Sequence, residues 1–159
     1  MIDQLTSTSS SSYIIGYSDS KIAKSETNDC VVRSFASAFK VTYDQAHEFV
    51  ATKFLRKNRK GTARYVTTMN NMSNHQQSLW GKTLRRIGNG NSKNSLSYME
   101  NAKMRNMTTF QFLKKYPKGT YMVTVRQHAF TIHDGVVIGN HEDVIKTKKV
   151  ILHAWEVVS

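Results

Sequence analysis

Apolar positions after residue 30 recur at spacings of three and four, which is the period of one helix face. They are Val31, Phe35, Ala38 and Phe39. Asn28 and Asp29 stand just before this run, and both are favoured N-cap residues. The pattern therefore predicts a helix that begins at Cys30.

Two further helices are predicted from capping signals. Thr42 and Gln45 have the spacing of a capping box, and the apolar residues behind them share one face. Thr108 and Gln111 repeat this signal and open a shorter helix, which the Pro-Lys-Gly run at 117–119 ends. Helices therefore precede the last third of the chain.

The apolar period changes to two after this last helix, which predicts strands. The candidate strands are Tyr121 to Val125, Ala129 to His133, Val136 to Ile138 and Val150 to Val158. Asp134 and Gly135 form a strong hairpin signal, and a tight turn there pairs His133 with Val136. His128 then lies at the open end of the hairpin. Helices before an antiparallel sheet predict an α+β fold, with N-terminal helices packed on a C-terminal sheet.

Composition divides the chain into one domain and a lead-in. The first dozen residues include a serine-rich run and no apolar stretch, and we expect residues 1–20 to form a flexible N-terminal segment rather than a signal peptide. Residues 21–159 are expected to form a single domain. Residues 57–107 are polar and weakly periodic, which predicts an insertion within that domain.

The chain is strongly basic, with 23 Lys and Arg against 11 Asp and Glu and a formal net charge of +12. Such a charge favours an acidic partner, either a nucleic acid or an acidic host protein. The basic residues are dispersed in small groups, however, as they also are on an ordinary solvated surface. No apolar run approaches the roughly 20 residues of a spanning helix, and a lone cysteine suits a reducing compartment. We therefore expect a cytoplasmic protein without a membrane partner.

Cys30 and His128 are the candidate reactive pair. The N-terminus of a helix carries about half a positive charge, which favours the thiolate form of a cysteine placed there. His128 stands at the end of a strand, where an imidazole can serve as the base for that thiolate. The alternative is that Cys30 is a small buried apolar residue and His128 a surface or turn residue.

Three blocks of sequence resemble the papain-like cysteine peptidases of small bacteriophage-encoded proteins. They are Asn28 to Arg33, Phe112 to Tyr121 and His128 to Val137. The first block is also similar to that of ovarian-tumour-type deubiquitinases. The resemblance implies a papain-like fold, with the cysteine at the start of the central helix, the histidine on the sheet, and a polar third residue on the next strand.

This chain departs from the family pattern at two positions. No Gln precedes Cys30 as an oxyanion donor, and Asn28 is the available substitute, although it also suits a helix cap. The phage relatives place an Asp near the end of the second hairpin strand, where Asn140 is the natural residue to orient His128. Strict pairing turns Asn140 away from the His128 face, so a bulge or loop is required; Asp143 is the reserve candidate.

The expected function is a papain-like cysteine hydrolase that cleaves a peptide, isopeptide or related amide bond. Cys30 attacks, His128 transfers the proton, and Asn140 orients the ring. No cofactor is required. A metal site is not expected, because the spacing of the histidines in the sheet region matches no zinc pattern. The alternatives are a basic interaction protein with an inactive papain-like fold, and a transferase that uses the same acyl-enzyme.

Overall fold

The computed structural model describes residues 13–88 and 96–159. The helices are α3 (Lys21–Ser25), α4 (Cys30–Phe39), α5 (Tyr43–Lys53), α6 (Tyr65–Asn74), α7 (Thr109–Lys115) and α8 (His141–Ile145). The strands are β1 (Thr83–Ile87), β2 (Ser97–Glu100), β3 (Lys103–Asn106), β4 (Thr120–Val125), β5 (His128–His133), β6 (Val136–Ile138) and β7 (His153–Val158). Within these residues no helix combines the length and apolar composition that crossing a bilayer requires.

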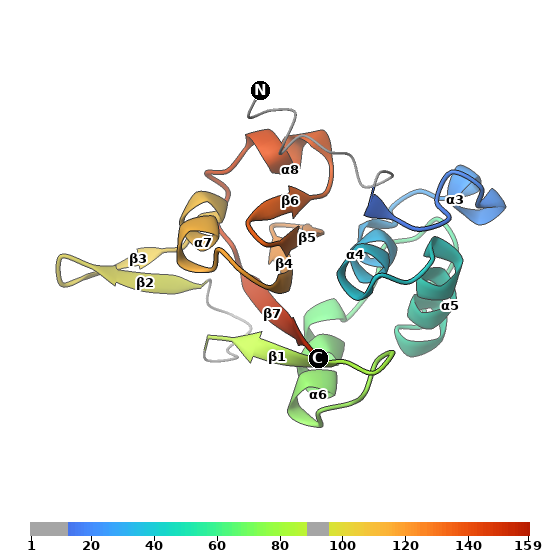
Figure 1. Ribbon diagram of the computed structural model, residues 1–159, viewed down its shortest axis with the longest axis horizontal. Coiled ribbons are helices and arrows are strands. Elements are labelled where there is room, and N and C mark those ends of the chain that lie inside the picture. Colours follow the sequence, from blue (N-terminus) through green and yellow to red (C-terminus); the bar gives the residue numbers. More distant parts are fainter. Residues whose placement is uncertain (1–12, 89–95) are drawn as a thin grey trace.

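One antiparallel sheet of five strands organises the molecule, in the order β1-β7-β4-β5-β6. The helices α4 and α5 lie on one side of it and α7 and α8 on the other, while the ribbon β2-β3 projects from the body (Figure 1). The expected α+β class, with helices packed on an antiparallel sheet, is confirmed.

The hairpin of β5 and β6 has the register that the sequence predicts. His133 pairs with Val136 around the Asp134-Gly135 turn, and His128 lies at the other end of β5, opposite Val125 of β4. Both turn residues have positive φ, 47° at Asp134 and 78° at Gly135. This is the backbone that the Asp-Gly pair favours in a two-residue hairpin.

The two faces of the sheet are buried in separate apolar clusters. Met122, Ala129 and Trp155 contribute to the cluster that includes the helices α4, α5 and α6. Phe130 and Ile132 belong to the cluster that includes α7 and α8. The Cys30 helix therefore packs on the Ala129 face of β5, and not on the face that His128 shares with Phe130 and Ile132.

Within the described residues, the segment 57–107 contributes to the body of the domain. It contains α6, whose Met69 and Met72 are fully buried, and β1, which pairs with β7 at one edge of the sheet. Of the predicted flexible segment 1–20, residues 1–12 lie outside the described residues. In the rest of it, Ile14 is buried and Ile15 makes a β-bridge with Thr42.

Hydroxyl groups join α4 to β5 inside the apolar layer. Thr131, fully buried on β5, donates to the Ser34 carbonyl at 3.0 Å and accepts from the Ser37 hydroxyl at 3.0 Å. The Ser34 hydroxyl lies 3.0 Å from the same Thr131 oxygen. These bonds fix how far α4 slides along β5, because each buried hydroxyl requires its partner.

We predict that Thr131→Val lowers the free energy of unfolding by about 1–3 kcal/mol, because the buried Ser34 hydroxyl and carbonyl lose the Thr131 hydroxyl as a partner. Denaturant unfolding of the two proteins measures the difference. Thr67→Val, an exposed threonine on α6, is the matched control and is expected to change stability by less than about 0.5 kcal/mol. A Thr131→Val protein as stable as the parent would show that this cluster does not hold the helix on the strand.

Candidate active site

Cys30 is the first residue of α4 and its thiol is free. The N-cap residue Asp29 makes no side-chain cap hydrogen bond. Its carboxylate instead accepts from the Tyr43 hydroxyl at 2.7 Å and pairs with Arg33 at 3.3 Å. The backbone N–H groups of the first helical turn, which have no partner within a helix, are therefore not capped by Asp29.

His128, the first residue of β5, is hydrogen-bonded on two sides. Its Nε2 lies 2.7 Å from Oδ2 of Asp143 on α8. The ring also bonds the Cys30 sulfur, which receives a second hydrogen bond from the Ala129 backbone. Thiol, imidazole and carboxylate thus form one chain, since Nε2 faces Asp143 and the other ring nitrogen remains for the sulfur.

The electrostatic environment of Cys30, His128 and Asp143 favours the charged forms of the thiol and the imidazole. Burial opposes ionisation of Cys30, but the hydrogen bonds from His128 and Ala129 and the positive charges of His128 and Arg33 lower the pKa of its thiol. Burial likewise opposes the charged imidazole, but Asp143 and Cys30 raise the pKa of His128 to about 9. Both shifts point the same way, towards a thiolate beside an imidazolium.

The contact expected of Asn140 is made by Asp143. Asn140 is the N-cap of α8, and its backbone N–H donates to Asp143 Oδ2 at 2.7 Å. The side chain of Asp143 is almost completely buried, with 3% of the residue exposed. The chain leaves the strand direction at Gly139 and turns into a short helix, so the alternation that governs β6 no longer applies. One helical turn then brings Asp143 back to the ring.

The side-chain amide of Asn28, the candidate oxyanion donor, has a partner in another loop. The residue has a positive φ of 54°, and its side-chain N–H donates to the Arg59 carbonyl at 3.1 Å. The amide is used to join two loops, and the residue is exposed at the rim of the cavity.

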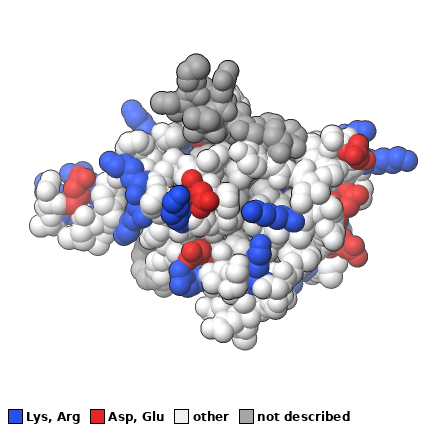
Figure 2. Space-filling model, viewed as in Figure 1, with Lys and Arg blue, Asp and Glu red and all other residues white. Residues whose placement is uncertain are grey.

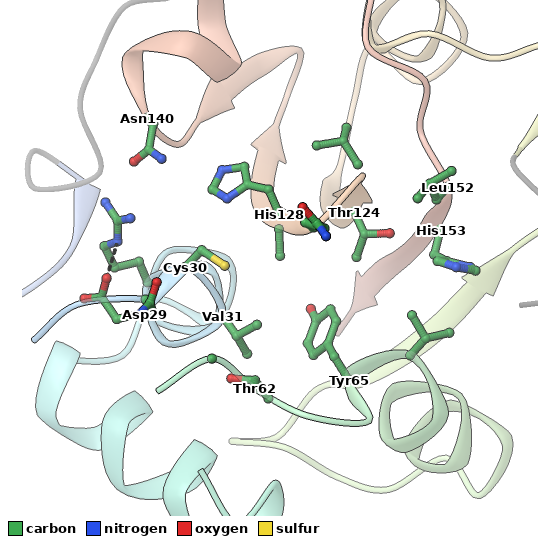
Figure 3. Close-up of a pocket in the computed structure, with 17 residues that line it drawn as sticks. Asp29, Cys30, Val31, Thr62, Tyr65, Thr124, His128, Asn140, Leu152 and His153 are labelled. Atoms are coloured by element: carbon green, nitrogen blue, oxygen red, sulfur yellow. Dashed lines mark ion pairs between the residues drawn. The ribbon is translucent and has the colours of Figure 1, made fainter. Parts of the chain in front are cut away.

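The Cys30 and His128 side chains lie side by side at the edge of an open cavity (Figure 3). The cavity has a volume of about 580 Å³. Tyr65, Thr62 and Thr124 line it, and their hydroxyl oxygens are buried without a hydrogen-bond partner in the described residues. The sequence gives no sign of the Tyr65 and Thr62 hydroxyls, because α6 and the loop before it lie in the segment with poor periodicity. Thr124 lies on β4, where the sequence predicts a strand but not this role.

The loop before Cys30 is held in place by a buried ion pair. Both carboxylate oxygens of Glu26 accept from Arg56, at 2.9 and 3.0 Å, and both side chains are at most 2% exposed. Arg56 also donates to the Thr27 carbonyl at 3.0 Å. This ion pair ties the chain before α4 to the chain after α5 and so positions the start of the Cys30 helix.

The remaining histidines of the sheet region have other contacts. His133 bonds the Thr120 hydroxyl at 2.6 Å, and His153 bonds Arg86 at 2.9 Å. Burial and the charge of Arg86 lower the pKa of His153 to about 4, so it is neutral at physiological pH. Among residues 13–88 and 96–159 no group of three or more His, Cys, Asp or Glu side chains is arranged to hold a metal ion.

On the face in Figure 2, Lys and Arg are spread singly over the surface, and several stand beside Asp or Glu. This face offers no continuous basic patch of the kind that follows a nucleic-acid backbone.

Comparison with protein-family models, with curated proteins and with solved structures found no match. The chemistry of the site is therefore argued from its own geometry.

Removing Arg56 is expected to destabilise the protein in a pH-dependent way. Arg56→Met leaves Glu26 charged and buried without its partner, and we expect a loss of about 3–5 kcal/mol of unfolding free energy at pH 7. Burial opposes the charge of Glu26, but Arg56, His47 and the Arg59 N–H hold its pKa at about 2 against an ordinary 4.5. The contribution of the charged Glu26 to the free energy of unfolding is fully present above pH 4.5 and is lost as the pH falls towards 2.

The difference between the parent and Arg56→Met is therefore expected to narrow below pH 4.5, as measured by urea unfolding across pH. Arg85→Met breaks an exposed pair with Glu156 and is the control, with an expected loss of at most about 1 kcal/mol at any pH. A difference between parent and Arg56→Met that does not vary with pH would contradict the assignment.

Asp143 and Asn140 can be separated by the reactivity of Cys30. Asp143→Ala removes the charge that raises the pKa of His128, which weakens the imidazolium that holds the thiolate. We expect alkylation by iodoacetamide at pH 6 to slow about tenfold or more, since each unit of thiol pKa changes the thiolate fraction tenfold there. Asn140→Ala keeps the backbone N–H that holds Asp143 and is expected to react like the parent. Equal slowing in both variants would contradict this assignment.

Proposed function

We propose that the chain is a papain-like cysteine hydrolase that acts on a peptide, isopeptide or related amide bond. The observation that carries the proposal is the continuous chain from Cys30 through His128 to Asp143 at the edge of an open cavity. Buried structural cysteines have no need of an imidazole that is itself oriented by a buried carboxylate. Nucleophile, base and orienting group in this order are the arrangement that nucleophilic catalysis requires.

The reaction follows from the protonation states. The Cys30 thiolate attacks the carbonyl carbon of the substrate, and the carbonyl electron pair moves onto oxygen. The tetrahedral intermediate collapses as the His128 imidazolium gives its proton to the leaving amine, which leaves a thioester on Cys30. Neutral His128 then takes a proton from water, and the hydroxide so formed attacks the thioester carbon. Collapse of this second intermediate breaks the carbon–sulfur bond, releases the acid, and restores the Cys30 thiolate beside the His128 imidazolium. Asp143 holds the ring in the required orientation throughout.

The position of each group supports a papain-like arrangement. The nucleophile begins a helix packed against the sheet, and the histidine begins the strand against which that helix lies. The third group follows on the next element after the hairpin, as in the expected order, although it comes from the short helix α8 and is Asp143. An amine acceptor in place of water would make the same acyl-enzyme a transferase.

Turnover of a fluorogenic peptide-amide library tests the proposal. We expect release of the fluorophore by the full chain, and loss of at least about 10³-fold in Cys30→Ala and in His128→Ala. The rate is expected to rise with pH as Cys30 ionises, below the ordinary thiol value of about 8.5, and to fall near pH 9 as His128 loses its proton.

Lys82→Ala, a half-buried lysine in the turn before β1, is a control that should leave turnover unchanged. The proposal fails if no library member is cleaved and iodoacetamide alkylates Cys30 with a midpoint near pH 8.5, since that combination describes an ordinary thiol.

A further inference from the structure

Tyr65 is a buried tyrosine whose hydroxyl has no hydrogen-bond partner among the described residues. The residue is 9% exposed and lines the cavity beside Cys30. Other buried tyrosines are satisfied: the Tyr43 hydroxyl donates to Asp29 and the Tyr121 hydroxyl to the Lys118 carbonyl. A buried hydroxyl left unpaired costs about 1–3 kcal/mol, so an exception beside a nucleophile calls for a ligand.

The tyrosine ring is held rigidly. Tyr65 is the first residue of α6, and its ring packs against Phe54 and, edge to face, against Trp155, with centroids 5.7 and 5.8 Å apart. Its hydroxyl end points up into the cavity, towards the space between Cys30 and Thr124 (Figure 3). Burial and the negative charge of Cys30 raise the pKa of Tyr65, so the hydroxyl keeps its proton and remains a donor.

A second donor belongs to Cys30 itself, at the start of α4. The first-turn N–H groups of α4 are free of the Asp29 carboxylate, which is held by Tyr43 and Arg33. The positive end of the ten-residue helix α4 faces the cavity at this point. The side-chain amide of Asn28 already donates one hydrogen bond, to the Arg59 carbonyl.

We propose that the Tyr65 hydroxyl and the Cys30 backbone N–H form the oxyanion hole of this site. The inference rests on the proposed function and names the groups that stabilise its transition state. As the Cys30 sulfur bonds to the carbonyl carbon, the carbonyl electron pair becomes a lone pair on oxygen, and this oxygen accepts hydrogen bonds from both donors. When the leaving group departs, the double bond re-forms and Tyr65 retains its proton.

Two reactions of the same thiolate separate this role from others. Acetylation by p-nitrophenyl acetate places negative charge on a carbonyl oxygen before nitrophenolate leaves. Alkylation by iodoacetamide displaces iodide directly and places no charge on oxygen. We expect Tyr65→Phe to slow acetylation of Cys30 about 100-fold and to leave the rate and pH profile of alkylation unchanged.

Controls cover folding and background chemistry. Tyr65→Phe removes a buried unpaired hydroxyl, so its melting temperature should equal or exceed that of the parent. Tyr121→Phe alters a buried tyrosine at the other end of β4 and should acetylate like the parent. Acetylation of the Cys30→Ala protein measures the background reaction at other groups. The intact mass of the parent protein, compared with that of Cys30→Ala, then identifies the acetyl group on Cys30.

The outcomes distinguish the two proposals. Acetylation of Tyr65→Phe at the parental rate, or equal slowing of acetylation and alkylation, would overturn the role of Tyr65 while leaving the cysteine hydrolase intact. A parent protein that is alkylated rapidly but never acetylated would overturn both, because acyl transfer is the step on which they depend.

Discussion

The site depends on the position of α4 along β5. Four helical residues advance about 6 Å and two strand residues about 6.6 Å, so the two elements keep step over this distance. Ser34 meets Thr131 at one end of the interval, and Cys30 meets Ala129 and His128 at the other. The buried Thr131 hydroxyl therefore does more than join two layers. Its bond to Ser34, 97 residues away in the sequence, sets the register of α4 on β5. That register brings the Cys30 sulfur and the His128 imidazole together.

Two other constraints act on the same reacting atoms from outside this register. The Glu26–Arg56 pair fixes the entry to α4, and the turn at Gly139 fixes α8 and its carboxylate. The carboxylates involved, Glu26 and Asp143, are both buried and both have several hydrogen-bond partners, which is the condition under which burying a charge is tolerated. Because Asp143 is shielded from water, its charge acts strongly on His128, and this in turn lets a half-buried cysteine ionise. The apolar layers provide rigidity, and the buried carboxylates provide the charge pattern.

Local signals in the sequence predicted local structure well. The Asp-Gly turn gave the register of β5 and β6, and the Thr42 and Thr108 hydroxyls cap α5 and α7 as the spacing indicates. These features depend on a few neighbouring residues and on backbone chemistry. The meeting of Cys30 with His128 followed from helix and strand ends combined with a family resemblance, and the geometry now gives it a physical basis.

Features that depend on distant residues were missed for identifiable reasons. Helix α6 buries Met69 and Met72 but is otherwise rich in Asn and Thr, so its apolar period is weak. Strand β1 is completed only by β7 from the end of the chain, and no local pattern announces that pairing. The choice of Asn140 followed strand alternation past the point where the strand ends. Asn140 and Asp143 have the spacing of an N-cap and its third helical residue, which was an available signal for a helix start.

Gly139 shows how closely the chain is fitted around this carboxylate. A Cβ atom built on Gly139 would overlap Asp143 Oδ2 and approach the Phe130 Cβ to 2.9 Å. Its φ is not positive, so the requirement is for space and not for an unusual backbone. Asp143 reaches His128 only by lying against a backbone that lacks a side chain. The contact between Asp143 and His128 therefore depends on two residues, on Asp143 for the carboxylate and on Gly139 for the space that it occupies. A carboxylate that only stabilised a helix N-terminus would need neither this burial nor the contact with His128.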